Sequence, residues 1–451
     1  MTSGWTYASP EQAWAVFAPR RIDNARMSPC GHWLAWSETG DDGRLWVAAA
    51  DGTALPRVVV ERPHPIRFHL WAPDGGGIVH VADDLGTGVW QLLHTSVDRA
   101  TIGTAGQSLG TTRAITDLDE HADLLAVSPR RPSTLLLAVD DHELGLPHVD
   151  QYDLRTHMRR RVAVNFGTVD GWFTDTGLTV RAATAATSDG GFDLLHRVDA
   201  GAPWRIVTHI APDAALTTTI VSLPDRDTVV LIGTFETDTT QLVAIDTRTG
   251  RRRVLGSATD ADIERVLVDP RTGWPQAYAV AAQRRRWIAL DAHIADDLGV
   301  AGSTNADVRV VDRSDDNGRW LLAEETPDEP TRFVCWDRRQ RARHLASHPT
   351  AGRPSRRGST ELISVRARDG MVLHGYWRSP RRGTAPHPTV LLVHGGPWWR
   401  DNWVHDPWRD WIDELGFACL QINFRGSAGR GAAFAAAGTR HWGGPGHRRP
   451  R

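Results

Sequence analysis

The sequence contains no lysine: all 52 of its basic residues are arginines. This excludes chemistry that depends on a lysine side chain, such as a P-loop lysine, a Schiff-base lysine or a lysine general base. The 52 basic residues are balanced by 54 acidic ones. The chain as a whole therefore has no strong field to attract nucleic acid or an anionic membrane surface, and neither is expected as a partner.

Cysteine is also scarce. Cys30, Cys335 and Cys419 are odd in number and far apart, which fits neither a disulfide framework nor a metal-binding spacing. The motifs His-Glu-x-x-His and Cys-x-x-Cys are both absent. We therefore expect no metal and no cofactor, and a reducing, cytoplasmic setting.

Long apolar runs are absent as well. No stretch of 18 apolar residues occurs, and the first residues lack the basic-then-apolar pattern of a signal peptide, so neither a membrane helix nor a leader is expected. Within the N-terminal segment 1–21, Ser9 and Pro10 are a suitable N-cap and first residue for a short helix. The 451 residues, 41% of them hydrophobic, are enough for two or three globular domains.

What the sequence has in quantity is short β-rich segments separated by Asp, Gly, Asn and Pro turns, over residues 22–349. Long helical patterns are absent there, which is typical of an all-β fold. The segments recur in units of roughly 40 to 50 residues, as in a β-propeller, where stacking covers the faces that one unit leaves open. Seven units can be laid out, marked by Ile22, Ile66, Ile115, Asp170, Thr228, Ile263 and Val308. We therefore predict a seven-bladed β-propeller, and the alternative interpretation is an irregular pair of β-sandwiches.

The pattern changes after residues 350–360, which are polar, basic and Gly/Pro-bearing and are interpreted as an interdomain linker. Over 361–451 the sequence alternates strands and helices. Asp369-Gly370 predicts a hairpin turn. Val390–Val393 is apolar without polar alternation and predicts a parallel strand buried on both faces.

A helix is expected after that strand. Asp406 is its predicted N-cap and Pro407 its first residue. Trp408, Trp411, Ile412 and Leu415 follow at helical spacing, and Gly416 ends the helix. A further strand is predicted over 417–424, before a glycine-rich turn.

Two motifs carry a resemblance to a known family. Leu391-Leu392-Val393-His394-Gly395-Gly396-Pro397 is followed, after the helix, by Asn423-Phe424-Arg425-Gly426-Ser427-Ala428-Gly429 and then by His441-Trp442-Gly443-Gly444. Together they resemble the prolyl oligopeptidase family of serine peptidases, in its acylaminoacyl-peptidase and dipeptidyl-peptidase branch. The resemblance implies a propeller followed by an α/β-hydrolase domain, and propeller-gated hydrolysis of short peptides, which are the implied partners.

The resemblance also implies roles for named residues. Gly396 and Gly395 become candidates for the oxyanion hole, because glycines let backbone N–H groups approach a developing oxyanion. The alternative is that these glycines only make a tight turn. The candidates for the wall of the site are His394, Pro397, Asn423, Arg425 and Gly426.

The catalytic triad of the family has no counterpart here. In an α/β-hydrolase the nucleophilic serine stands in a Gly-x-Ser-x-Gly elbow between a strand and a helix, and the acid and histidine follow it. By resemblance the elbow would come after Gly444, and the sequence stops at Arg451. The match at Gly106–Gly110 has no strand before it and no helix after it, so it is rejected.

We therefore expect a C-terminally truncated hydrolase domain over 361–451 that lacks the catalytic Ser, Asp and His and is inactive alone. The alternative is a non-catalytic β-propeller that binds partners or acts as a scaffold. Without the strand that would pair beside it, Val390–Val393 would have an open edge, which predicts an oligomer through the exposed edge of the hydrolase sheet.

Overall fold

The computed structural model describes residues 22–38, 43–53, 55–83, 85–98, 109–118, 120–140, 145–301, 306–345, 358–381, 383–396 and 398–439. The predicted N-terminal helix, most of the predicted linker, Pro397 and most of the Gly106–Gly110 motif lie outside these residues.

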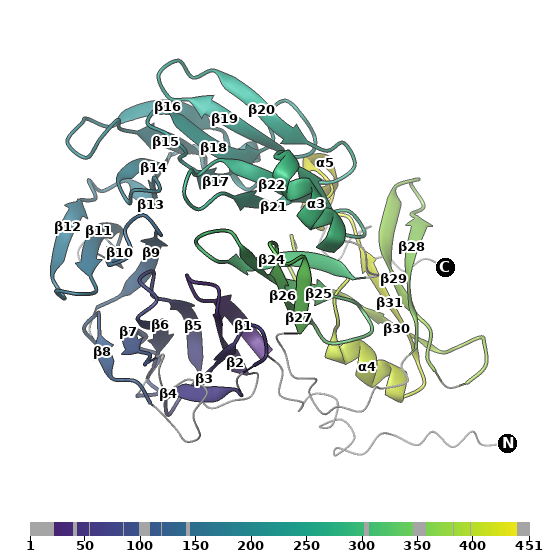
Figure 1. The fold of residues 1–451 in the computed structure, drawn as a ribbon. Coiled ribbons are helices and arrows are strands. Elements are labelled where there is room, and N and C mark those ends of the chain that lie inside the picture. Colours follow the sequence, from purple (N-terminus) through teal and green to yellow (C-terminus); the bar gives the residue numbers. More distant parts are fainter. Residues whose placement is uncertain are drawn as a thin grey trace.

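Seven antiparallel sheets follow one another over residues 22–345 and are arranged in a ring (Figure 1). The strands of each sheet lie side by side in chain order, so each sheet is a simple up-and-down unit. The first four sheets consist of β1 (Ile22–Met27), β2 (Trp33–Glu38), β3 (Arg44–Ala49) and β4 (Arg57–Glu61); β5 (Ile66–Trp71), β6 (Gly77–Ala82), β7 (Gln91–Ser96) and β8 (Thr112–Ala114); β9 (Ala122–Val127), β10 (Thr134–Asp140), β11 (Pro147–Asp153) and β12 (Arg159–Ala163); and β13 (Val169–Thr174), β14 (Val180–Ala186), β15 (Phe192–His196) and β16 (Arg205–Ile210). The next three consist of β17 (Thr219–Ser222), β18 (Thr228–Gly233), β19 (Gln241–Asp246) and β20 (Arg252–Ser257); β21 (Ile263–Val268), β22 (Pro275–Val280) and β23 (Arg286–Ala289); and β24 (Asp307–Arg313), β25 (Arg319–Glu325), β26 (Arg332–Asp337) and β27 (Ala342–Leu345).

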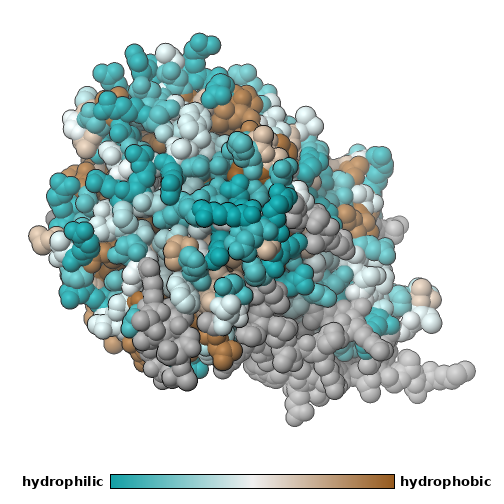
Figure 2. Space-filling view, in the orientation of Figure 1, coloured by the Kyte–Doolittle hydropathy of each residue, from teal (hydrophilic) through white to brown (hydrophobic). Residues whose placement is uncertain are grey.

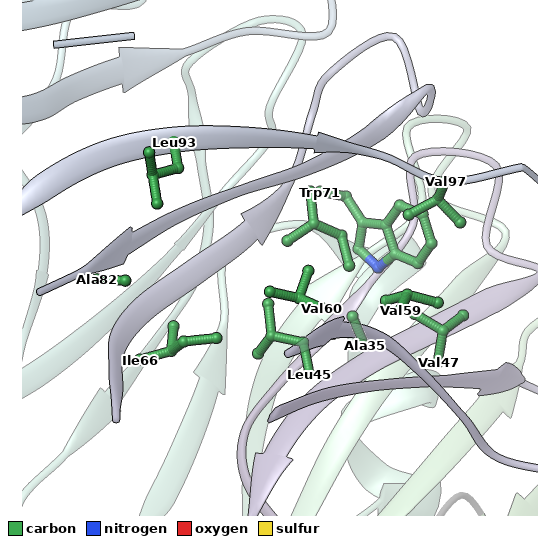
Figure 3. Packing of buried hydrophobic residues seen from close by; sticks show 11 residues of the cluster. Ala35, Leu45, Val47, Val59, Val60, Ile66, Trp71, Ala82, Leu93 and Val97 are labelled. Atoms are coloured by element: carbon green, nitrogen blue, oxygen red, sulfur yellow. The ribbon is translucent and has the colours of Figure 1, made fainter. Parts of the chain in front are cut away.

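Hydrophobic side chains fill the space between neighbouring sheets. Figure 3 shows one such cluster, to which the first sheet contributes Leu45, Val47 and Val59 and the second sheet contributes Trp71 and Leu93. The ring closes in the same way, because Trp36 of the first sheet packs with residues of β25 and β26. The face of the ring seen in Figure 2 is largely hydrophilic, with hydrophobic residues scattered over it. This arrangement confirms the predicted mostly-β, propeller-like region.

The sixth sheet differs from the other six sheets of the ring, each of which has four strands. The described residues give it three strands, and helix α3 (Ala292–Ala301) then packs beside β23. Ile294 and Leu298 of α3 are buried in the cluster shared with the last sheet. Asp297 accepts a hydrogen bond from Trp336 Nε1 at 3.0 Å. The prediction that this region has no helical pattern is thus wrong at α3, and α2 (Pro212–Ala215) adds a single turn before β17.

An eighth sheet follows the ring, in the order β28-β29-β31-β30. Its elements are β28 (Thr360–Arg366), β29 (Val372–Arg378), β30 (Thr389–Leu392), α4 (Pro407–Glu414), β31 (Ala418–Asn423) and α5 (Ala432–Ala436). Gly370 has φ +88° in the predicted hairpin turn, and β30 pairs in parallel with β31 through the crossover that contains α4. None of the described helices is long and apolar enough to cross a membrane.

Strand β30 is more exposed than the sequence predicted. Leu391 is 52% exposed and Val393 is 50% exposed, whereas the sequence predicted burial on both faces. The physical reason is position: β30 lies at the edge of the sheet and, among the described residues, pairs only with β31. Its parallel pairing was predicted correctly.

Helix α4 begins as predicted, since the Asp406 carboxylate accepts a hydrogen bond from Trp408 N at 3.0 Å. Its buried face differs from the predicted apolar stripe, because Trp408 is half exposed. The buried residues of the helix are Arg409, Asp410, Ile412 and Asp413. Three of these are charged, so the contact of α4 with the sheet is largely ionic.

The partner of these carboxylates is Arg378 at the end of β29, which is 1% exposed. Its guanidinium lies 3.3 Å from Asp410 and 3.1 Å from Asp413. It also lies 3.5 Å from Asp328, which belongs to the loop between β25 and β26 of the ring. One buried arginine therefore joins helix α4, the eighth sheet and the ring.

Candidate functional site

The turn after β30 contains His394, Gly395 and Gly396. Gly396 has φ +138°, and a Cβ atom there would lie 2.8 Å from Trp399 N and 3.0 Å from Trp398 N. Only glycine fits without strain. No hydrogen bond joins the N–H of Gly395 or Gly396 to another described residue, so both N–H groups can donate a hydrogen bond to a ligand oxygen.

The side chain of His394 is fixed on three sides. Its Nε2 lies 2.8 Å from Ser427 Oγ and its Nδ1 lies 2.7 Å from Gly395 O. The ring stacks on Phe424 with centroids 4.4 Å apart. Because a carbonyl oxygen only accepts hydrogen bonds, Nδ1 carries a hydrogen and donates a hydrogen bond to Gly395 O. His394 thus holds the backbone of the glycine turn.

Ser427 and His394 form a serine–histidine pair, the arrangement that activates a nucleophile. The surroundings do not suit that role. Ser427 is 0% exposed and its Oγ lies 2.7 Å from Phe424 O, so the hydroxyl cannot reach a substrate carbonyl. Ser427 supports His394 from behind. Sequence reasoning placed it in the turn without a role, and the signal available was its position directly after the predicted wall residues.

Asn423 is buried and faces the loop after Gly396. Its Oδ1 accepts from Asp401 N at 2.8 Å and its Nδ2 donates to Asp401 O at 3.1 Å. Gln421 Nε2 donates to Asp401 Oδ1 at 3.0 Å. Burial raises the pKa of Asp401. Asn423 therefore supports the loop backbone, and Asp401 is a residue that sequence reasoning missed, since nothing near it marks a site.

Arg425 points to the β28–β29 hairpin. Its guanidinium lies 2.7 Å from Asp369, and the hydrogen bond from Arg425 lowers the pKa of that carboxyl. Gly426 has φ +99°, and a Cβ atom there would lie 3.2 Å from Gly438 Cα. Of the predicted site residues that are described, the structure brings His394, Gly395 and Gly396 together with the Asn423–Gly426 turn, while the Arg425 side chain is committed elsewhere.

The tryptophans near the site do not form a single cluster. Trp398 and Trp399 are exposed beside Gly396. Trp403 is buried against Tyr376, with ring centroids 5.9 Å apart. Tyr376 in turn donates from its hydroxyl to Gln283 O of the ring at 3.0 Å. The ring therefore lies directly against this sheet. In the part of the chain that the structure describes, no group of His, Cys, Asp and Glu side chains is arranged to hold a metal ion.

Comparison with known proteins bears on the whole chain. The chain is 29% identical over 450 residues to dipeptidyl aminopeptidase BIII of Pseudoxanthomonas mexicana, and the match covers 96% of this chain and 63% of that protein. The resemblance to the prolyl oligopeptidase family is confirmed. The chain thus spans less than two thirds of the length of this dipeptidyl aminopeptidase, and no family model matches it.

Solved structures of peptidases share the fold of this chain. A puromycin-hydrolyzing peptidase of Mycobacterium tuberculosis superposes with a TM-score of 0.66 at 14% identity, over 98% of this chain and 72% of that one. Prolyl oligopeptidase B of Galerina marginata superposes with a TM-score of 0.64 at 10% identity, over 95% of this chain and 66% of that one. At these identities the likeness concerns the fold.

Proposed function

We propose that the chain forms a seven-bladed propeller and the first part of an α/β-hydrolase domain in a serine peptidase of the prolyl oligopeptidase type, which acts on short peptides. The observation that carries this proposal is the turn at Gly395 and Gly396. Two N–H groups without partners among the described residues stand at the end of a parallel strand, beside the ring. Donors placed in this way stabilise the oxyanion of acyl transfer.

We also propose that these 451 residues alone bind short peptides but do not hydrolyse them. The support is chemical. The serine–histidine pair in the described residues is buried at Ser427. The Gly-x-Ser-x-Gly match at Gly106–Gly110 lacks the sequence context of a nucleophile elbow.

The test measures binding and turnover in the same samples. Short chromogenic peptides with free and with acylated N-termini are titrated into the purified chain. Isothermal titration calorimetry reports binding, and release of the chromophore reports turnover. Gly396→Ala should weaken binding because a side chain there displaces the turn. Gly370→Ala is the matched control, since Gly370 also has positive φ and a Cβ there meets nothing within 4 Å.

The possible outcomes distinguish the proposed function from its alternatives. Binding without turnover that Gly396→Ala alone weakens supports the proposal. Turnover by the 451-residue chain would overturn the proposed inactivity. Binding that neither substitution changes would favour a propeller that binds partners elsewhere on the ring.

We further propose that the exposed side of β30 joins copies of the chain. Leu391 of this edge strand and Val393 just after it are exposed apolar residues, and an unpaired strand edge favours association. Light scattering should show that Leu391→Arg dissociates the assembly, whereas Leu362→Arg, on the far strand β28, leaves it intact. A native chain that is monomeric at high concentration would contradict this.

A further inference from the structure

Asp262 connects the ring to the glycine-rich turn before α5. It lies between β20 and β21, and its Oδ2 accepts from Gly431 N at 2.9 Å. Its own N–H donates to Gly429 O at 3.0 Å. Its Oδ1 accepts from Thr240 N at 3.0 Å, and its carbonyl accepts from Ala281 N at 2.8 Å. One residue therefore joins two other segments of the ring to the turn.

Asp238, in the loop between β18 and β19, makes a second connection. Its carbonyl accepts from Ala432 N at 2.8 Å and its Oδ1 accepts from Ala433 N at 2.7 Å. The first N–H groups of a helix have no partner within the helix, so the ring supplies partners for α5. Gly431 has φ +92°, and a Cβ atom there would overlap the Asp238 carboxylate. The close approach thus depends on glycine.

The same turn is bonded to the candidate site. Two residues before Gly429, Ser427 Oγ contacts His394 Nε2 at 2.8 Å. Ala428 N donates to Trp399 O at 3.2 Å. Next to Trp399, the Arg400 guanidinium donates to Ala282 O of the ring at 2.9 Å. The turn and the loop after Gly396 are therefore held to each other and to the ring.

We propose that Asp262 and Asp238 are positioning residues for the candidate oxyanion turn: they hold the glycine-rich turn, which through Ser427 and His394 sets the backbone at Gly395 and Gly396. The meaning for catalysis rests on the proposed function. The mechanical coupling does not, so it can be measured without any enzyme activity.

The carboxylate of Asp262 suits this task because both of its oxygens accept from backbone N–H groups. An asparagine offers one acceptor oxygen, and its NH2 group would face an N–H donor. Asp262→Asn should therefore lose one of the two hydrogen bonds while keeping the shape of the side chain. Asp238→Ala should lose the bond to Ala433 only, since the bond to Ala432 uses the backbone.

Hydrogen exchange followed by mass spectrometry tests the coupling on the full chain. Asp262→Asn should speed amide exchange over residues 427–433 by about tenfold, the effect of losing one buried hydrogen bond. It should also speed exchange of the Cε1 hydrogen of His394, whose ring loses its fixed contact with Ser427. Asp246→Asn is the matched control, because Asp246 is also a ring carboxylate that accepts from backbone N–H groups, those of Arg248 and Thr249 in its own loop.

Ser427→Ala locates the link. It should speed exchange at His394 and leave the Gly431 amide protected, because the contact broken lies between the turn and the histidine. The proposal is overturned if Asp262→Asn loosens the turn while His394 exchanges at the native rate, or if neither site changes. Asp238→Ala provides the same comparison should Asp262→Asn fail to fold. If the native chain does not bind short peptides, this result counts against the proposed function and does not affect the coupling between Asp262 and His394.

Discussion

The buried ion cluster around Arg378 makes a sharp prediction for Arg378→Met. The substitution keeps the length of the side chain and removes its charge. Asp410 and Asp413, both buried, then lose their shared cation at 3.3 and 3.1 Å. Breaking a buried ion pair by removing one partner costs about 3 to 5 kcal/mol, because the remaining charge is left uncompensated.

The expected loss of stability lies at the low end of this range, because both carboxylates keep other hydrogen-bond partners. Asp413 still accepts from Gly358 N at 2.8 Å and from Arg381 N at 2.9 Å. Asp410 keeps its contact with His405 Nε2 at 2.8 Å. We therefore expect Arg378→Met to destabilise the eighth sheet by about 3 kcal/mol. Adding Asp410→Asn should return about 1 to 2 kcal/mol, since one uncompensated charge is then gone and an asparagine amide can still pair with His405 Nε2.

Pulse proteolysis in urea measures this locally, because cleavage within 358–439 can be followed apart from cleavage within the ring. Arg366→Met on β28 is the control, since that side chain is exposed and, among the described residues, donates a hydrogen bond to the hairpin carbonyl of Gly370. The reasoning is refuted if Arg378→Met shifts the urea midpoint for 358–439 no more than Arg366→Met does, or if the double variant is less stable than Arg378→Met alone.

Two further predictions concern other buried groups. Burial lowers the pKa of His69 from 6.5 to about 4, so the folded state favours the neutral ring. The contribution of this neutral ring to the free energy of unfolding is complete above pH 6.5. It is lost as the pH falls toward 4, which reduces the stability by up to about 3 kcal/mol. His69→Leu should reduce the slope of stability against pH in that window, measured by urea titration at several pH values, and an unchanged slope would contradict the assignment. Tyr376→Phe removes the hydrogen bond to Gln283 O and should cost about 1 kcal/mol in urea unfolding; no loss would mean that this contact between sheet and ring is not formed in solution.

Features set by neighbours in the chain could be predicted from the sequence. The Asp369-Gly370 hairpin, the Asp406 cap of α4 and the recurring strand units depend on turn and capping chemistry within a few residues. The seven-blade count and the extent of the hydrolase domain remain proposals, because they depend on how such units assemble.

Features set by distant partners could not be predicted. Arg378 meets Asp413 across 35 residues and His394 meets Ser427 across 33. Apolar periodicity identifies a hydrophobic face, so it assigned Trp408 to the buried side of α4 and missed the charged residues there. It likewise recognised Val390–Val393 as apolar, but whether a strand is covered depends on which strands lie beside it.

The measurement that tests the central claim most directly is labelling of the purified 451-residue chain with an active-site serine probe, read by intact mass and peptide mapping. We expect no adduct, because Ser427 is buried behind His394 and no nucleophile elbow was identified in the sequence. A stoichiometric adduct on Ser427, or on any other serine of the chain, would contradict it.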